Sequence, residues 1–562
     1  MNTHRARLVG TVSVLVAVVL AMLSPKSASA GVGVPYPTDD PFYSYTGAKP
    51  LADYAPGEIL KSRTTTVTLP DLPAPVTMTQ ILYRTRDQLG KPVATVTSVL
   101  NPPTPAPTVR LLSYQSFYDA LTVRCEPSYM LSGGPTNSLW TSEVKMVEAL
   151  LTQGFTMAIS DFESQDPAFG TGPVYGYESL DGIRAAYNST DVALPSGTKV
   201  GMVGYSGGAI ATEWASELAP TYAPDVAANL VASAFGGVFV HPMHNLHYVD
   251  GSDSWSGVMP LALIGIGKAF KLDFTPYLSD KGKTVLNLVK NDCIGEHPLP
   301  NLTFASLVKP QYAKAESIPI FVDTANALIM GSHGLPKTSV PMLIREGSDV
   351  QQGEGTAPSP TYGPGDGVML VNDVRSLVHK YCDAGISIDY AESPLGHSDQ
   401  GAAFLAEAGP WMAAQFAGAP AVSTCATVQP GNSLAPTPRA KPAVICHGLV
   451  ATIVGTPRAN RIHGTPGRDV IAAGGGNDTI TGAGGNDVIC AGRGNDVVSG
   501  GSGNDWIQGG PGADTLRGNA GNDVLRARDR DVDHAISGGR GRDRALVDRR
   551  DPRPTSASYQ RG

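Results

Sequence analysis

Short apolar runs alternate with segments of helical periodicity in the first part of the chain. The runs at 109–114, 155–159 and 200–203 are typical of buried strands, and the segments 141–153 and 178–187 between them have the apolar spacing of helices. Strands that alternate with helices favour a mainly parallel sheet with helices on its faces. The pattern therefore predicts the α/β class.

The same region carries further strand patterns on either side. Residues 64–69 and 80–84 alternate between polar and apolar, which predicts early antiparallel strands. Downstream, residues 340–345 and 386–390 predict two late strands, separated by a helix that ends near Cys382. These elements extend the predicted sheet to about residue 390.

A second pattern begins near residue 445, where aspartates recur every nine residues in glycine-rich turns. Each aspartate has an apolar residue two positions later, as Ile480 follows Asp478. A flexible glycine-rich linker would not keep a carboxylate in phase over so many repeats. The period resembles the nonapeptide calcium-binding repeat of the RTX type, which predicts a parallel β-roll. The predicted calcium ligands are Asp469, Asp478, Asp487, Asp496, Asp505, Asp514 and Asp523.

Stacked carboxylates repel one another, so we expect folding of this tail to depend on calcium. The predicted roll spans 445–545 and follows a proline-rich linker at 426–444. Residues 454–460 resemble a degenerate opening repeat. The arginine-rich end predicts either a closing cap or a disordered tail, and 546–562 form its basic last part.

The first thirty residues predict export from the cell. Residues 1–30 combine early arginines, an apolar run and small residues at 28–30, which predicts a secretory signal peptide; an uncleaved anchor is the alternative. We therefore expect a secreted protein that could also stay at the cell surface, in which the six cysteines can form disulfides. The length of 562 residues predicts more than one domain, and the net charge of -8 gives no reason to expect nucleic-acid binding.

The candidate chemistry begins at residues 204–208, which read Gly-Tyr-Ser-Gly-Gly after the strand at 200–203. A Gly-x-Ser-x-Gly motif between a strand and a helix predicts a nucleophile elbow, in which a sharp turn exposes the serine. Ser206 is therefore the predicted nucleophile. Its hydroxyl needs a base to remove the proton and donors to hold the oxyanion.

His397 lies in the loop after the last predicted strand, where the α/β-hydrolase fold that this pattern predicts places its general base. The acid should lie between Ser206 and His397 in the chain. Asp349 follows the strand at 340–345 most directly, whereas Asp366 stands just before the following helix. These positions alone leave both carboxylates open as the triad acid.

Residues 35–425 resemble the secretory lipases of the lipase A type. The resemblance rests on 118–119 with 125–129, on 204–209, on 218–224, and on the block from Asp366 through Cys382 to His397. It implies an α/β-hydrolase domain over 31–425 that hydrolyses lipid esters, with a helical cap at about 235–320. The spacing from Asp366 to Cys382 fits the family and favours Asp366, although the long loop 349–365 departs from it and keeps Asp349 as the alternative.

The resemblance also implies particular partners for several residues. It pairs Cys125 with Cys293 and Cys382 with Cys425, which leaves Cys446 and Cys490 as a pair that could staple the roll. It further implies that the backbone N–H groups of Asp119 and Gly207 form the oxyanion hole.

Two features of the expected cap have open roles. The apolar segment 258–267 could line an acyl pocket, face a lipid interface or simply pack onto the body. His241, His244 and His247 stand three residues apart, as metal ligands on one helix face could, but we favour surface or pocket-lining roles.

Together these patterns predict a secreted serine ester hydrolase, a triacylglycerol lipase or carboxylesterase, that acts on a lipid or ester substrate. A lipid–water interface is a possible place of action. Calcium is expected as a structural ion of the tail, and no cofactor is expected for catalysis. One alternative is a catalytically silent calcium-binding surface or adhesion protein; another is a different serine hydrolase or acyltransferase of the same fold. The oligomeric state stays open.

Overall fold

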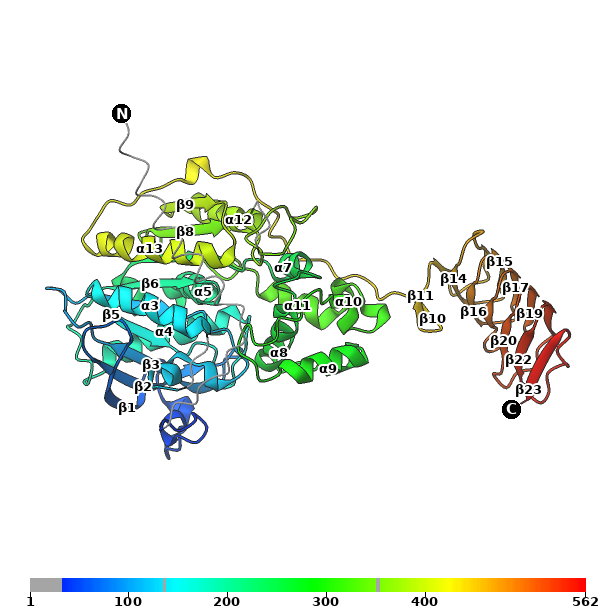
Figure 1. Cartoon of the computed structure of the whole chain (residues 1–562), viewed down its shortest axis with the longest axis horizontal. Coiled ribbons are helices and arrows are strands. Elements are labelled where there is room, and N and C mark those ends of the chain that lie inside the picture. The colour runs from blue at the N-terminus through cyan, green and yellow to red at the C-terminus, as the bar shows by residue number, and fades with distance from the viewer. Residues whose placement is uncertain (1–32, 135–137, 350–353, 562) are drawn as a thin grey trace, which may run out of the picture. The chain divides into compact units, whose positions relative to one another are not determined.

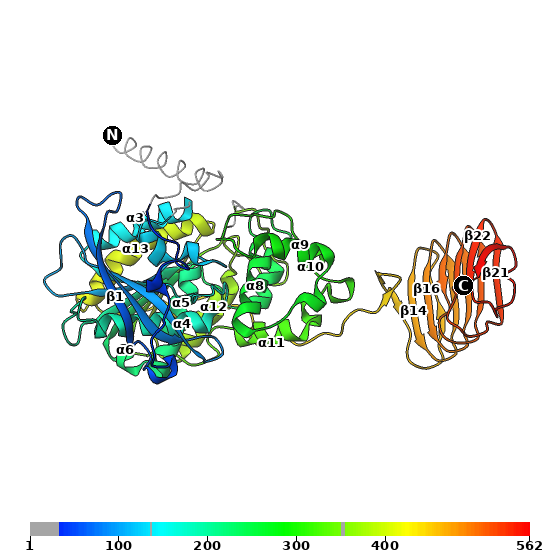
Figure 2. The same ribbon diagram turned by 90° about the horizontal axis from the view of Figure 1, so that it is seen from below.

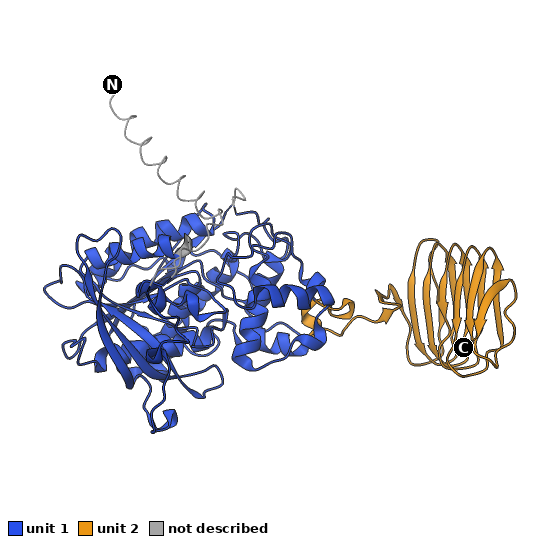
Figure 3. Ribbon diagram, turned by 60° about the horizontal axis from the view of Figure 1, so that its bottom comes forward, with its two compact units in different colours: residues 1–307, 319–438 blue, residues 308–318, 439–562 orange. Residues whose placement is uncertain are grey.

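The computed structural model describes residues 33–134, 138–349 and 354–561. The predicted signal peptide, residues 1–30, lies outside the described residues. The described chain forms two compact units, one made of residues 33–307 with 319–438 and the other of 308–318 with 439–561 (Figure 3). Each unit has its own sheets and its own core, and each is described by itself.

The larger unit, here called the body, is built on a nine-stranded sheet (Figure 1). Its strand order is β1-β2-β3-β5-β4-β6-β7-β8-β9. The first three strands and β5 pair antiparallel, and all pairs from β5 to β9 are parallel. The strands are β1 (Ile59–Val67), β2 (Val76–Arg86), β3 (Pro92–Leu100), β4 (Leu111–Gln115), β5 (Thr156–Ser160), β6 (Val200–Tyr205), β7 (Leu230–Gly236), β8 (Met342–Gly347) and β9 (Ile388–Ser393).

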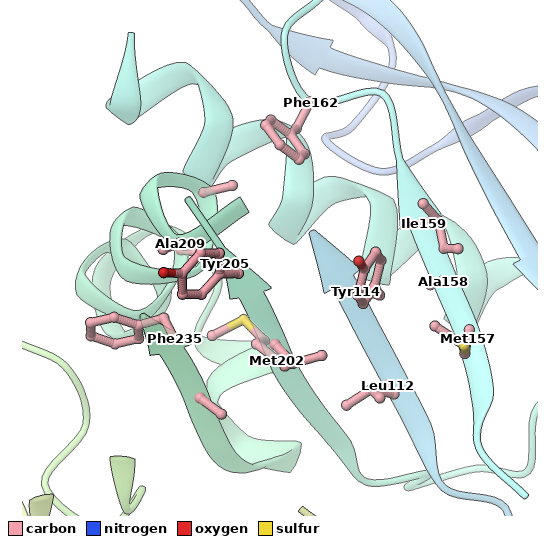
Figure 4. Close-up of a cluster of buried hydrophobic side chains, with 14 of the residues drawn as sticks. Leu112, Tyr114, Met157, Ala158, Ile159, Phe162, Met202, Tyr205, Ala209 and Phe235 are labelled. Carbon is pink, nitrogen blue, oxygen red and sulfur yellow. The ribbon is translucent and has the colours of Figure 1, made fainter. Parts of the chain in front are cut away.

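Helices connect the parallel strands, as their geometry requires. The main ones are α3 (Ser138–Thr152), α4 (Gly172–Asn188), α5 (Gly207–Tyr222), α12 (Val371–Asp383) and α13 (His397–Phe416). They cover the sheet, and its central strands are buried on both sides: β4, β5 and β6 are buried at every position. Figure 4 shows Leu112, Met157, Met202 and Phe235 from four neighbouring strands in this core, each at most 1% exposed.

The chain between β7 and β8 carries an additional group of helices. These are α7 (Pro242–Val249), α8 (Val258–Phe270), α9 (Asp280–Val289), α10 (Phe304–Leu307) and α11 (Pro319–Ala327). The apolar segment 258–267 lies in α8, where Met259, Leu261, Leu263 and Ile266 are buried. Gly265 packs so closely on the backbone of Phe169 that any side chain would collide there. Packing onto the body therefore accounts for most of this segment.

The second unit contains two parallel sheets of short strands, one of seven and one of five (Figure 2). The first sheet contains β12 (Ile453–Val454), β14 (Val470–Gly475), β16 (Val488–Arg493), β18 (Trp506–Gln508), β20 (Val524–Ala527), β22 (Asp543–Val547) and β23 (Ala557–Arg561). The second contains β13 (Arg461–His463), β15 (Thr479–Gly484), β17 (Val497–Ser502), β19 (Thr515–Ala520) and β21 (Ala535–Arg540).

Successive nonapeptides enter alternate sheets, so a strand pairs with the strand two repeats away. Ile471 lies opposite Ile489, and Ile489 opposite Ile507, at steps of 18 residues. The apolar residue of each repeat points into a common core between the sheets, where Ile480, Val498 and Leu516 are at most 1% exposed. This arrangement confirms the predicted parallel β-roll.

The roll continues beyond the period seen in the sequence. β22 and β23 pair in parallel, so the arginine-rich end adds strands instead of a disordered tail. The proline-rich segment divides between the units, and its first part packs on the body, where Asn432 N donates to Asn372 O at 2.9 Å. Within the described ranges, no helix is long and apolar enough to cross a membrane.

Candidate functional sites

Ser206 stands at the turn between β6 and α5. Its φ of 55° and ψ of -120° are unfavourable for a residue with a side chain, and such strain persists only where the surroundings enforce it. Gly204 and Gly208 permit the turn, because a Cβ at either would collide with backbone oxygens of Gly208 and Gln115. The turn holds Ser206 at the carboxyl end of a central strand, where open α/β sheets place their ligands.

His397 begins α13, directly after β9, and is 4% exposed. Its Nε2 lies 2.7 Å from Ser206 Oγ, and its Nδ1 lies 2.5 Å from Asp366 Oδ2. Two backbone contacts fix the residue: His397 N donates to Asp366 O at 2.7 Å, and Tyr205 Oη donates to His397 O at 2.7 Å. The imidazole therefore bridges the serine and one carboxylate.

The two candidate acids lie in different surroundings. Asp366 is fully buried, and its Oδ1 accepts hydrogen bonds from Val368 N at 3.0 Å and Met369 N at 2.7 Å, which leaves Oδ2 for the imidazole. Asp349 instead accepts from Glu354 N at 2.8 Å through its Oδ2. The structure thus brings Asp366 against His397 and Asp349 against the backbone of Glu354.

The surroundings of His397 stabilise its protonated form. Burial lowers the pKa of His397, but the Asp366 carboxylate and its hydrogen bond outweigh burial and hold the pKa above its usual value. Behind Asp366, burial and then the charge of that carboxylate raise the pKa of Glu346 well above its usual range. Burial beside a second carboxylate therefore disfavours the charged form of Glu346.

The oxyanion candidates lie beside Ser206. Within the described residues, neither Asp119 N nor Gly207 N donates a hydrogen bond, and Gly207 opens α5, where the dipole is positive. The Asp119 side chain fills the space beside Gly207, whose Cβ would collide with it. Burial raises the pKa of Asp119 to about 7, and the charge of His397 opposes this. Sequence reasoning considered only the backbone of Asp119 and missed this carboxyl.

Glu354, after the strand β8, connects two other segments beside His397. Glu354 accepts from Trp255 Nε1 at 3.2 Å through one oxygen and from Ser398 N at 3.0 Å through the other. The Trp255 ring lies edge-on to His397, with centroids 5.3 Å apart. This contact, which the sequence did not predict, covers the imidazole with an aromatic ring from the inserted helical segment.

The histidines at 241, 244 and 247 form a ring stack. His241 and His244 lie face to face with centroids 3.7 Å apart, and His244 also stacks on Tyr362 at 4.1 Å. His244 Nδ1 pairs with Asp373 Oδ1 at 3.0 Å, and His241 Nε2 contacts Ala435 O at 3.2 Å. His241 Nε2 and His244 Nδ1 thus have protein partners, whereas His241 Nδ1 is buried without one within the described residues. The stacked rings fit a packing role.

The three disulfides join Cys125 with Cys293, Cys382 with Cys425, and Cys446 with Cys490. The first two are those that the lipase resemblance implied, and the third connects the start of the roll to β16. Disulfide bonds of this kind are typical of exported proteins.

The aspartates of the roll form a ladder along the turns. In each step, one backbone N–H donates to the Oδ1 of the aspartate two repeats later, as Asp487 N does to Asp505 at 2.9 Å. The same pattern connects Asp478 with Asp496, Asp496 with Asp514, and Asp505 with Asp523. The ladder fixes every carboxylate in one orientation.

The second oxygens of this ladder have no partner in the described chain. Oδ2 is buried and unpaired in Asp478, Asp487, Asp496, Asp505, Asp514, Asp523, Asp533 and Asp543. Glycines border these atoms: a Cβ at Gly500 would collide with Asp505 Oδ2. Hard carboxylate oxygens in a cradle kept free of side chains suit calcium. Asp469 differs, because its Oδ2 accepts from Thr465 N at 2.6 Å.

Sequence reasoning missed the last steps of the ladder, at Asp533, Asp543 and Asp551. Asp523 N donates to Asp543 Oδ1 at 2.9 Å, and Asp533 N donates to Asp551 Oδ1 at 3.2 Å. The fixed period hid them because the spacing changes after Asp523. The glycine pair at 538–539 before Asp543 repeats the motif and could have revealed this step.

The parallel sheet, the strained serine and the adjacent histidine define an α/β-hydrolase. Comparison with known proteins gives the family. The secretory lipase family matches residues 135–349, and RTX calcium-binding nonapeptide repeats match 454–489 and 491–525. Lipase 6 of Candida albicans is 30% identical over 439 residues, which cover 74% of this chain and 90% of that protein. The chain therefore belongs to the secretory lipase family.

Two further relatives bear on function. The structure of Candida antarctica lipase A in its closed state matches with a TM-score of 0.59 and 27% identity, covering 72% of this chain and 92% of that one. A Mycobacterium tuberculosis protein named "Probable inactive lipase MT1628" is 41% identical over 224 residues. That match covers 38% of this chain and only 49% of the relative.

Proposed function

We propose that the protein is a secreted serine ester hydrolase, a triacylglycerol lipase or carboxylesterase, with Ser206, His397 and Asp366 as its catalytic triad. The observation that carries the proposal is the contact of 2.7 Å between Ser206 Oγ and His397 Nε2, with Nδ1 of the same ring on Asp366. Family membership supports a hydrolase of lipid or ester substrates.

The reaction begins when Ser206 Oγ adds to the ester carbonyl carbon while His397 Nε2 takes the hydroxyl proton. The carbonyl oxygen becomes an oxyanion, which the N–H groups of Asp119 and Gly207 stabilise. His397 then gives its proton to the departing alcohol oxygen as the C–O bond breaks, which leaves an acyl-enzyme. Water, deprotonated by His397, then adds to this acyl group. His397 returns the proton to Ser206 Oγ as the bond between the acyl carbon and Oγ breaks, which releases the acid.

Asp366 acts through the imidazole. Its Oδ2 accepts a hydrogen bond from His397 Nδ1–H, so Nε2 carries the lone pair that faces Ser206. The charge of Asp366 stabilises the imidazolium that forms during each proton transfer. Trp255 and the loop with Glu354 shield the pair from water, which strengthens these interactions.

The tail is proposed to fold with calcium. The ladder carboxylates from Asp478 to Asp543 would hold the ions through their unpaired Oδ2 atoms, and bound calcium would supply the positive charge that offsets their repulsion. Export, which these repeats and the family favour, would expose the tail to the calcium levels outside cells.

Hydrolysis of p-nitrophenyl esters with short and long acyl chains tests the proposal. The mature protein should release p-nitrophenol, Ser206→Ala should not, and the ratio of rates would rank the acyl lengths. If both forms are inactive, the result would instead support the second candidate, a catalytically silent scaffold in which the calcium-binding roll carries the function. The relative named as a probable inactive lipase is the observation that favours this candidate.

A further inference from the structure

The ladder of the roll changes its spacing near its C-terminal end. Up to Asp523, each ladder hydrogen bond spans 18 residues, as from Asp496 N to Asp514 Oδ1 at 2.8 Å. The next one, from Asp514 N to Asp533 Oδ1 at 2.8 Å, spans 19. The additional residue lies in the turn between β20 and β21, which carries acidic and basic side chains in place of the usual glycines.

This altered turn brings a third carboxylate to the ladder. One carboxylate oxygen from each of Asp514, Asp529 and Asp533 lies within 4.8 Å of the others. Among the residues that the structure describes, this is where three such ligands meet; the regular steps contribute ladder aspartates alone.

Each of the three aspartates has one oxygen engaged and one without a partner. The Oδ1 atoms accept backbone N–H groups: Asp496 N on Asp514, Asp514 N on Asp533, and Asp531 N on Asp529 at 2.8 Å. The three Oδ2 atoms are buried and unpaired. Asp514 is 0% exposed and Asp533 3%, so water does not solvate these carboxylates freely.

The backbone of the turn is held independently of any ion. Asp548 Oδ2 accepts from Asp529 N at 2.9 Å and from Arg530 N at 2.5 Å, and Arg530 has a φ of 85°. Asp529 is therefore positioned before a ligand arrives, which lowers the cost of ordering it on binding.

We propose that Asp514, Asp529 and Asp533 form a distinct calcium site with three carboxylates, the tightest of the roll. The proposal rests on the proposed role of the roll in calcium binding and adds a ligand, Asp529, that lies outside the nine-residue period. Calcium takes six to eight oxygen ligands in flexible geometry, and its affinity rises with the number of charged ligands and the rigidity of the site. Backbone carbonyls and water would complete the shell.

Calcium titration of the full chain by calorimetry, after removal of bound calcium, tests this site. We expect one ion per chain to bind at least about tenfold more tightly than the ions of the regular ladder. Asp529→Asn should abolish this tight binding step of the titration and keep the weaker binding steps. Asn519 occupies the same position four residues before Asp523, so the roll already tolerates asparagine there.

Asp531→Asn is the matched control, because it removes the same charge from an exposed neighbour outside the cluster. The control should keep the tight step, and circular dichroism at saturating calcium should be the same for all three proteins. A tight step that survives Asp529→Asn, or that both variants lose equally, would overturn the site. Loss of every step in Asp529→Asn would also overturn it, and no calcium uptake by the unmutated chain would overturn the calcium-binding roll as well.

Discussion

The body and the roll both bury carboxylates, but they satisfy them differently. In the body, Asp366 is buried and each of its oxygens accepts protein hydrogen bonds, two from backbone N–H groups and one from His397. In the roll, the ladder aspartates from Asp478 to Asp543 have one oxygen paired and the other buried without a partner in the described chain. A buried charge without a partner is costly, so the first arrangement is complete as it stands and the second calls for a cation.

The difference separates two uses of strain. At Ser206 the backbone is held in an unfavourable conformation by contacts within the protein, and the site is organised before substrate arrives. In the roll, repulsion between carboxylates is left for a ligand to relieve, and we propose that this makes folding of the roll depend on calcium. The predictions below test this contrast, beginning with the largest expected effect.

Ser206→Ala should have the largest effect on catalysis. Removing the nucleophile should lower kcat for ester hydrolysis by a factor on the order of 10^5 to 10^6. Calcium titration of the variant should match that of the unmutated chain, because the ladder contains no residue of the body. Residual hydrolysis above about one per cent would contradict the assignment of Ser206.

Asp366→Asn should come next and distinguishes the two candidate acids. An amide in place of the carboxylate favours the wrong imidazole tautomer, so kcat should fall by about 10^4-fold. Asp349→Asn should lower kcat far less, because Asp349 contacts the backbone of Glu354. Steady-state kinetics of both variants decides between them, and the reverse order of effects would make Asp349 the acid.

The pH dependence of kcat/KM should report His397. Only the neutral imidazole can take the serine proton, and Asp366 raises the pKa of His397 above its model-compound value of about 6.5. Activity should therefore fall about tenfold per pH unit on the acid side, with a midpoint above 6.5. A midpoint well below 6.5 would show that burial outweighs the carboxylate.

Without calcium, the roll should lose stability as the pH rises. Burial raises the pKa of Asp505, Asp514 and Asp533 to about 7, whereas an aspartate in an unfolded chain titrates near 4. Between these values the folded roll binds more protons than the unfolded chain, so its free energy of unfolding decreases with rising pH across this window.

Thermal unfolding of the full-length Ser206→Ala variant, which lacks the predicted nucleophile, measures this effect. The unfolding is followed by circular dichroism in the presence of chelator. The roll should unfold several degrees lower at pH 8 than at pH 5, and added calcium should restore it at pH 8. A melting temperature that rises with pH in chelator would show that burial does not raise the pKa of the ladder carboxylates above that in the unfolded chain.

Much of the fold could be predicted from periodicity. Alternating apolar runs predicted the parallel sheet, and the nine-residue spacing predicted the roll, because both patterns repeat a local unit many times. The chain order of Ser206 and His397 placed both at strand ends, where the structure brings them together. Their catalytic roles stay predictions.

Other features depend on contacts between distant segments. Asp349 and Asp366 follow the same strand, and the inserted loop made spacing a weak guide to which one meets His397. The Asp119 carboxyl and the contact between Trp255 and Glu354 arise where three segments converge, which no local pattern encodes. Asp529 was missed because it lies where the repeat is broken.

Reaction with a fluorophosphonate probe is the most direct test of the central contrast. The probe phosphonylates an activated serine with loss of fluoride, and intact mass spectrometry measures the rate. The account predicts labelling of Ser206 at rates within about twofold in calcium and in chelator, because protein groups alone complete the site. No labelling, or labelling only with calcium, would contradict it.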